Sequence, residues 1–143
     1  MIESGNFIYK PNEYEAERAS NGYLISLIAL MGGIAIPVIN LAATFFFYIS
    51  NRSKPYFTRW HCTQVLLSQA VLFLLNSTAS CWTLLILWSR HILTDAYIAF
   101  LIILLIYNIC LFAFTIFSAV YTRKGKHVKW FFYGSLTDII TQK

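Results

Sequence analysis

Three long stretches of the chain contain no Asp, Glu, Lys or Arg, and they dominate its pattern of apolar and polar positions. They run over residues 24–51, 60–89 and 96–122. A transmembrane helix needs roughly 20 mostly apolar residues, so each stretch is long enough to cross a bilayer. Helices of a soluble bundle keep a polar face, and these stretches have almost none. The pattern therefore predicts an all-α integral membrane protein with three transmembrane helices.

The positions of the charged residues set the predicted boundaries. We expect a polar, acidic N-terminal tail over 1–22, transmembrane helices over 23–50, 61–89 and 96–122, a basic and aromatic interfacial loop over 51–60, and a short loop over 90–95. A kink is expected in the first helix near Gly33–Pro37, because proline lacks a backbone donor and clashes with the preceding turn. Residues 123–143 are expected to form a basic turn and an amphipathic interfacial helix, with a shallow fourth span over 128–140 as the alternative.

The second predicted helix carries a stripe of polar side chains that share one face at 100° per residue. Such a stripe must face protein or water, because an unpaired amide in lipid costs several kcal/mol. It suits interhelical hydrogen bonds, the wall of a hydrated cavity or channel, or a subunit interface. Each span also has one amide at mid-depth, and these amides are expected to meet inside the bundle. The candidate polar residues are His61, Gln64, Ser68, Gln69, Asn76, Asn40 and Asn108.

The charge distribution adds an orientation. Only 12% of residues are charged, with a formal net charge of +5. Basic residues near span ends favour the cytoplasmic side, so three spans place the N-terminus outside and the C-terminus inside a cell's inner (cytoplasmic) membrane. We expect the basic residues to contact anionic phospholipid as well, and no nucleic acid, which would require more charge on a soluble surface. They are Arg52, Lys54, Arg59, Arg123, Lys124, Lys126 and Lys129.

The reactive residues form no pattern typical of catalysis. Outside the acidic tail the only carboxylates are Asp95 and Asp138, and no Ser/His/Asp spacing or glycine-rich phosphate loop occurs. The cysteines at 62, 81 and 110 lack the spacing of a disulfide framework or a zinc site. We therefore expect no catalytic residue, no metal and no cofactor in a protein that is not an enzyme.

Short motifs carry a family resemblance over about residues 22–135. Ile36-Pro37 interrupts the first span, residues 56–65 read Tyr-Phe-Thr-Arg-Trp-His-Cys-Thr-Gln-Val, and Lys124-Gly125 precedes an aromatic stretch. This order resembles the small bacterial membrane proteins related to the twenty-kilodalton import-channel subunit of the chloroplast inner envelope, the Tic-like family. His61 and Gln64 match the family's His-Ala-x-Gln-Ala pattern. Its two alanines are replaced here, and the proline that usually follows the Lys-Gly pair is absent.

The resemblance implies an association with protein translocation, and the plant relatives have four spans. Together with the polar stripe, it predicts a non-enzymatic accessory or structural subunit of a larger inner-membrane complex. The expected partners are other membrane protein subunits, among them those of a protein translocon. Two alternatives stay open: a homo-oligomeric channel lined by the stripe of the second helix, and a lipid-interacting membrane protein.

Overall fold

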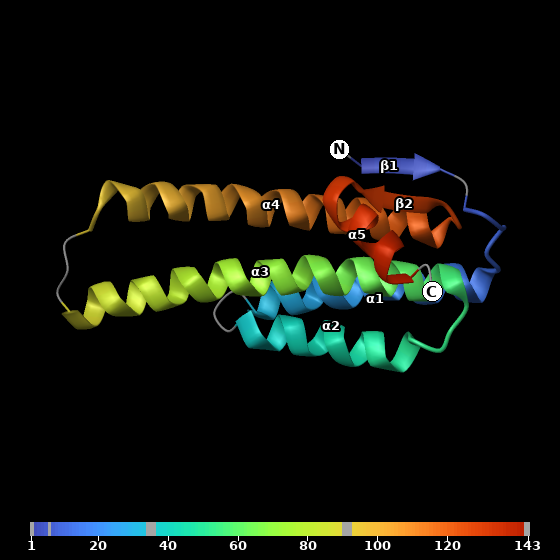
Figure 1. Cartoon of the computed structure of the whole chain (residues 1–143), viewed down its shortest axis with the longest axis horizontal. Coiled ribbons are helices and arrows are strands. Elements are labelled where there is room, and N and C mark those ends of the chain that lie inside the picture. The colour runs from blue at the N-terminus through green and yellow to red at the C-terminus, as the bar shows by residue number, and fades with distance from the viewer. Residues whose placement is uncertain (1, 6, 34–36, 90–92, 142–143) are drawn as a thin grey trace.

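The computed structural model describes residues 2–5, 7–33, 37–89 and 93–141, and these are helical apart from loops and two short strands. In chain order the elements are β1 (Ile2–Gly5), α1 (Glu13–Gly33), α2 (Pro37–Asn51), α3 (Tyr56–Ser89), α4 (Asp95–Arg123), β2 (His127–Trp130) and α5 (Phe131–Thr141). Helices α1 to α4 alternate in direction, and the strands and α5 gather at one end (Figure 1). We call this the basic end, because the α2–α3 loop and the turn after α4 lie there.

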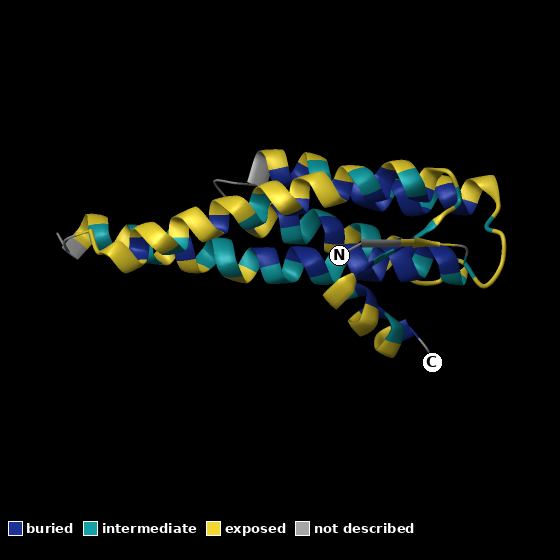
Figure 2. Ribbon diagram, turned by 90° about the horizontal axis from the view of Figure 1, so that it is seen from above, coloured by how far each residue is buried: buried dark blue, intermediate teal, exposed yellow. Residues whose placement is uncertain are grey.

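Two helices have the length and composition of membrane spans. Helix α3 has 34 residues and α4 has 29, which at about 1.5 Å per residue exceeds a hydrocarbon core of roughly 30 Å. Their most apolar windows have mean hydropathies of 1.8 and 2.6. Figure 2 shows many exposed residues along their outer halves, beyond the part that α1 and α2 cover. Among the described residues these are the two helices compatible with crossing a membrane.

The first apolar stretch is not a single span, which corrects the expectation of one kinked helix over 23–50. It belongs to two helices, α1 and α2, that pack against each other in opposite directions. Arg18 Nε donates a 2.7 Å hydrogen bond to Asn51 Oδ1, although 33 residues separate them. A continuous helix of that length would hold these residues about 50 Å apart. The chain therefore forms a helical hairpin whose two ends both lie at the basic end.

The sequence around the reversal explains why the chain breaks rather than bends. Pro37 is the first residue of α2, where its missing N–H costs nothing because the first helical N–H groups have no partner within the helix. On the other side of the reversal, α1 ends at Gly32-Gly33, because glycine is the poorest helix former after proline. The expected kink near Gly33–Pro37 falls partly on residues 34–36, which lie outside the described residues.

Local capping fixes the ends of the other helices. Asn12 Oδ1 accepts a 2.8 Å hydrogen bond from the N–H of Glu15 and so starts α1. Thr94 caps α4, accepting from the N–H of Tyr97. Gly125, with φ of 74°, makes the left-handed turn after α4 that most side chains disfavour. This turn sends the chain back toward the bundle as β2.

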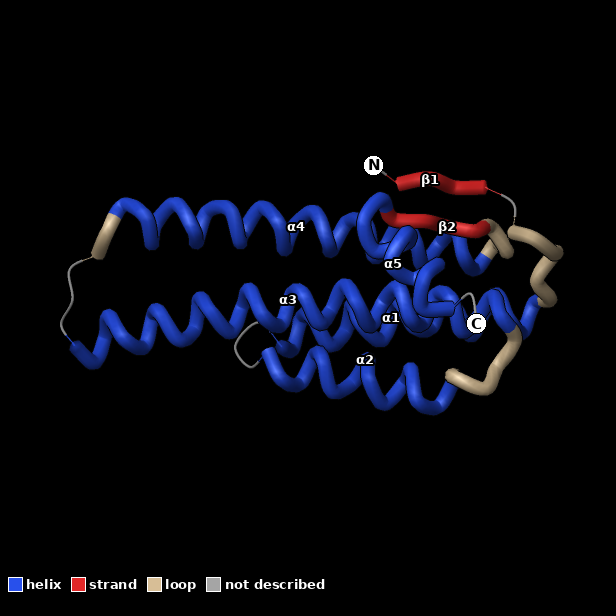
Figure 3. Tube along the Cα trace, viewed as in Figure 1, coloured by secondary structure: helices blue, strands red, loops and turns tan. Residues whose placement is uncertain are grey.

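The strands bring the two ends of the chain together. β1 pairs antiparallel with β2, with Ile2 opposite Trp130 and Gly5 opposite His127 (Figure 3). A strand cannot hydrogen-bond to a strand on the other side of a bilayer. The predicted placement of the N-terminus outside and the C-terminus inside is therefore wrong, because both ends lie on one side of any membrane that α3 and α4 cross.

Helix α5 is amphipathic, with one buried face and one exposed apolar face. Its small and polar residues Gly134, Thr137 and Thr141 are buried, and α5 packs on α3. A Cβ at Gly134 would clash with the side chain of Lys129, so glycine permits this close packing. The outward face carries exposed Phe and Ile side chains. The helix predicted over 128–140 begins only at Phe131, because 128–130 belong to β2.

Candidate functional site

The polar stripe of α3 contacts different elements at three successive positions along the helix. We call these positions the first, second and third levels, counted from the basic end. At the basic end, Gln64 is fully buried and joins three parts of the fold. Its Nε2 donates to Tyr23 Oη at 2.8 Å and to the carbonyl of Val128 at 3.1 Å. Its Oε1 accepts from the N–H of Trp130 at 3.1 Å. One amide side chain therefore ties α3 to α1 and to the inner side of β2.

His61 completes this first level, and it too is fully buried. Its Nδ1 lies 2.8 Å from Tyr23 Oη and its Nε2 lies 3.4 Å from His127 Nδ1. The rings of Phe57 and Trp60 pack edge-on against it, with centroids 4.6 and 5.0 Å away. Because both ring nitrogens face protein atoms, this histidine positions its neighbours and is not presented to a substrate.

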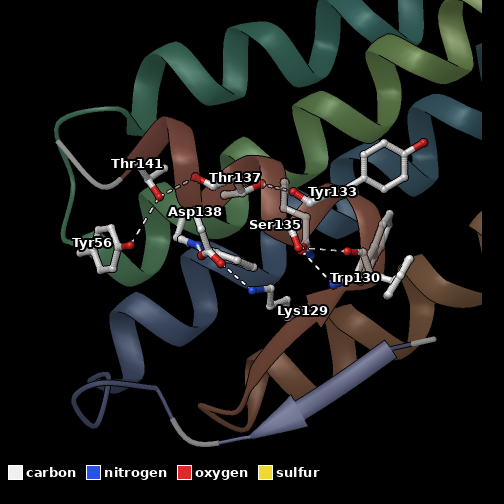
Figure 4. Close-up of polar contacts among 11 residues, drawn as sticks. Tyr56, Lys129, Trp130, Tyr133, Ser135, Thr137, Asp138 and Thr141 are labelled. Carbon is white, nitrogen blue, oxygen red and sulfur yellow. Dashed lines mark hydrogen bonds and ion pairs between the residues drawn. The ribbon is translucent and has the colours of Figure 1, made fainter.

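The carboxylate of Asp138 links three elements around the first level. Asp138 accepts from Lys129 Nζ at 2.5 Å (Figure 4). It also accepts from Trp60 Nε1 at 2.8 Å, so it joins α5 to β2 and to α3. Burial raises the pKa of Asp138, but the hydrogen bonds from Lys129 and Trp60 outweigh it and leave the pKa below its usual value. For His127, burial lowers the pKa to about 4, with Asp138 opposing this effect and Lys129 adding to it.

The depressed pKa of His127 predicts acid sensitivity. Between about pH 6.5 and about pH 4 the unfolded chain binds more protons at His127 than the folded chain. Stability is therefore lost as pH falls through this window and is flat above it. We expect the unfolding midpoint in mild detergent to fall between pH 7 and pH 5, and to fall less in His127→Gln. Equal pH dependence in the two proteins would contradict this role for His127. Groups facing His127, namely His61 and Asp138, are present in both.

The second level of the stripe lies against the hairpin. Gln69 Oε1 accepts a 2.6 Å hydrogen bond from Asn40 Nδ2 of α2, and both residues are buried. Ser68, one position earlier, is also buried and donates to the carbonyl of Val65 in its own helix. His61, Gln64, Ser68 and Gln69 are thus enclosed within the subunit. This removes the first half of the stripe from the lining of an intermolecular pore.

The third level is open. Asn108 Nδ2 of α4 lies 3.4 Å from Asn76 Oδ1, a long contact, and also donates to the carbonyl of Leu104 at 2.8 Å. Of the three mid-depth amides, two therefore meet, whereas Asn40 pairs with Gln69. Beside these two amides, a groove with a volume of about 290 Å³ lies between the outer halves of α3 and α4. We call it the interhelical groove, and its lining residues are Asn76, Ala79, Ser80, Thr83, Leu101, Leu104, Leu105 and Asn108.

The predicted basic residues all lie at the basic end, in different environments. Arg123 pairs with Glu17 at 3.3 Å. The ammonium groups of Lys124 and Lys126 lie 5.7 and 5.5 Å from the centre of the Tyr121 ring. Lys129 is held by Asp138, as above. The three from the α2–α3 connection differ: Arg52 and Arg59 line a cavity of about 320 Å³, and Lys54 is not among its lining residues.

Sequence reasoning missed several residues of the first level, chiefly Tyr23, His127, Trp130 and Asp138. Tyr23 is the first residue of the predicted helix over 23–50, so it was treated only as the boundary of that helix. The other three lie in the tail after α4, where an amphipathic helix was expected. Half-buried His127 and Lys129 alternate with buried Val128 and Trp130, which is the period of a strand, and this alternation was the available signal.

These observations define a class: a helical protein with two apolar helices compatible with a membrane, a packed helical hairpin, and a polar network at the basic end. Comparisons of the chain with protein families, with curated proteins and with solved structures gave no match.

Proposed function

We propose that this protein is a non-enzymatic accessory subunit of a larger inner-membrane complex. In this proposal α3 and α4 cross the membrane and the hairpin of α1 and α2 enters it from the basic end without crossing. The apolar parts of the hairpin, residues 23–33 and 37–51, are too short at about 1.5 Å per residue to span roughly 30 Å. Exposed Ile28, Met31 and Phe46 on its outer surface suit contact with lipid.

The interhelical groove is the observation that carries the proposal. Among the described residues, Asn76 Nδ2 and Asn108 Oδ1 make no hydrogen bond within the chain. Both residues are only partly buried. In lipid such atoms are costly, and a helix of another subunit would satisfy them. The expected occupant is therefore an apolar transmembrane helix with an amide or hydroxyl side chain at mid-depth.

The resemblance to the Tic-like family supports a translocation complex as the setting. The helices α1 to α4 also equal in number the four spans of the plant relatives, although α1 and α2 do not cross the membrane in this proposal. Basic residues outnumber acidic ones at the basic end, so we place that end, with both termini, in the cytoplasm.

A site-specific photo-crosslinking experiment tests the groove. A probe at Leu105 lies in the groove, whereas a probe at exposed Ile103 lies on another face of α4. We expect the Leu105 probe to capture one membrane protein in a fixed ratio and the Ile103 probe to capture lipid only. Asn76→Leu with Asn108→Leu should weaken that association by about fivefold, as about 1 kcal/mol of interhelical hydrogen bonding implies.

Three outcomes would contradict the proposal. Capture of lipid alone at Leu105 would leave the groove without a protein partner. Capture of a second copy of this chain alone would favour the homo-oligomeric alternative. An association that persists unchanged in the double variant, while the Leu105 probe captures the same protein, would mean that the amides do not recognise it.

A further inference from the structure

The cavity beside the α2–α3 loop has the composition of an anion site. We call it the arginine cavity, and it is lined by Tyr48, Arg52, Ser53, Arg59, Thr63, Ile140 and Thr141. It lies where α2 ends, α3 begins and α5 ends, so three elements build its walls. None of these lining residues carries a carboxylate. Two guanidinium groups therefore share a cavity that contains no charge to balance them.

Arg59 is the best-placed of these groups. Its Nε is buried and has no hydrogen-bond partner among the described residues. Its guanidinium lies 5.6 Å from the centre of the Tyr56 ring, an aromatic contact that orients the planar group without using its N–H donors. A buried donor without an acceptor costs roughly 1–3 kcal/mol. Arg59 also lines the cavity, so a ligand bound there could supply an acceptor to its guanidinium group.

Among the described residues, neither arginine of the cavity is paired with a carboxylate. The described ion pairs join Arg123 to Glu17 and Lys129 to Asp138, so neither arginine of the cavity belongs to one. The hydroxyls of Thr63 and Thr141 donate to backbone carbonyls of their own helices. Their oxygens can still accept a hydrogen bond, but they carry no charge that would balance the two arginines. Donors outnumber acceptors in the cavity, and the planar fork of arginine matches the oxygens of a phosphate.

We propose that the arginine cavity binds a phosphate group, with Arg59 as the central donor and Arg52 as the second. Its position favours the headgroup of an anionic phospholipid as the source. The cavity lies at the mouth of the hairpin, where exposed Ile49 of α2 and Ile140 of α5 offer apolar surface for acyl chains. This inference concerns a lipid or phosphate ligand and does not depend on the proposed protein partner.

The binding of defined probes to the full-length protein in neutral detergent tests the site. The probes are phosphatidylglycerol, phosphatidylcholine and inorganic phosphate, with bound lipid counted by native mass spectrometry and phosphate binding measured by calorimetry. We expect phosphatidylglycerol to bind more tightly than phosphatidylcholine, and Arg59→Gln to weaken it by about tenfold or more. Arg59→Lys should recover only part of this loss, because it restores the charge without the fork. Arg52→Gln, at an exposed position, provides a second variant that leaves the packing intact.

Lys54→Gln is the matched control, since it removes one positive charge from the loop beside the cavity but not from the cavity itself. Equal weakening by Lys54→Gln and Arg59→Gln would mean general surface electrostatics and would overturn the proposal. So would binding of every probe that is unaffected by Arg59→Gln and Arg52→Gln, or no binding of any probe. Arg59-dependent binding of inorganic phosphate that phosphatidylglycerol does not match would identify free phosphate as the source and support the site.

Discussion

Gln64→Leu is expected to destabilise the folded protein by about 3 kcal/mol. The substitution keeps the side chain's approximate volume but removes all its hydrogen bonds, leaving the N–H of Trp130 and the carbonyl of Val128 buried without that partner. Each buried polar group left unpaired costs roughly 1–3 kcal/mol. The measurement is the midpoint of thermal unfolding in mild detergent, followed by tryptophan fluorescence, because Trp60 and Trp130 both lie in this region.

A second measurement separates loss of the network from general damage to the bundle. The peptide bond after Lys129 is a potential trypsin site. In the folded protein Lys129 is held by its place in β2 and by its ion pair with Asp138, so this bond should resist cleavage. Gln64→Leu should expose this bond to cleavage while α3 and α4 remain folded. Ser68→Ala is the matched control, since Ser68 is equally buried on the same helix but bonds only to the carbonyl of Val65. If Gln64→Leu behaves like Ser68→Ala in both measurements, the network does not hold β2.

The sequence was sufficient to locate the long helices but not the hairpin. Residues 96–122 were predicted as a helix, and α4 runs over Asp95–Arg123, because charged residues mark both ends of an apolar run. The same reasoning failed for residues 23–50. Hydropathy shows only that the side chains can face lipid. A helix that crosses the membrane and a hairpin that enters it from one side both need such side chains, so hydropathy does not distinguish them. The glycines and Pro37 in mid-run were the physical sign of a reversal, and were read as a kink.

Non-local contacts explain what was missed at the candidate site. The stripe on α3 could be read from helical periodicity, and the structure places His61, Gln64, Ser68 and Gln69 together on its buried side. Their partners could not be read this way, because Tyr23 precedes Gln64 by 41 residues and Val128 follows it by 64. The pairing of β1 with β2 joins the two ends of the chain, and no local pattern within four residues specifies such a partner.

Cysteine labelling is expected to place both ends of the chain on the cytoplasmic side. In a background without native cysteines, Ser4→Cys and Lys126→Cys should react with a membrane-impermeant maleimide from the same side. Thr94→Cys, at the far end of the molecule, should react from the other side. The physical reason is the antiparallel pairing of β1 with β2, in which Ser4 is opposite Val128. Two crossing helices return the chain to the side from which it started.

A crosslink between Arg18→Cys and Asn51→Cys extends the same test to the hairpin. These residues make a 2.7 Å hydrogen bond across 33 residues of chain, so a short bismaleimide should join them within one molecule. A single kinked span would hold them about 50 Å apart, beyond the reach of the reagent. Arg18→Cys with Thr94→Cys is the negative control, because it pairs the two ends of the bundle. Failure of the Arg18–Asn51 crosslink, together with labelling of Ser4→Cys and Lys126→Cys from opposite sides, would restore the three-span topology. Success of both experiments would instead exclude three crossings and establish that α1 and α2 form a hairpin whose two ends lie on the basic side.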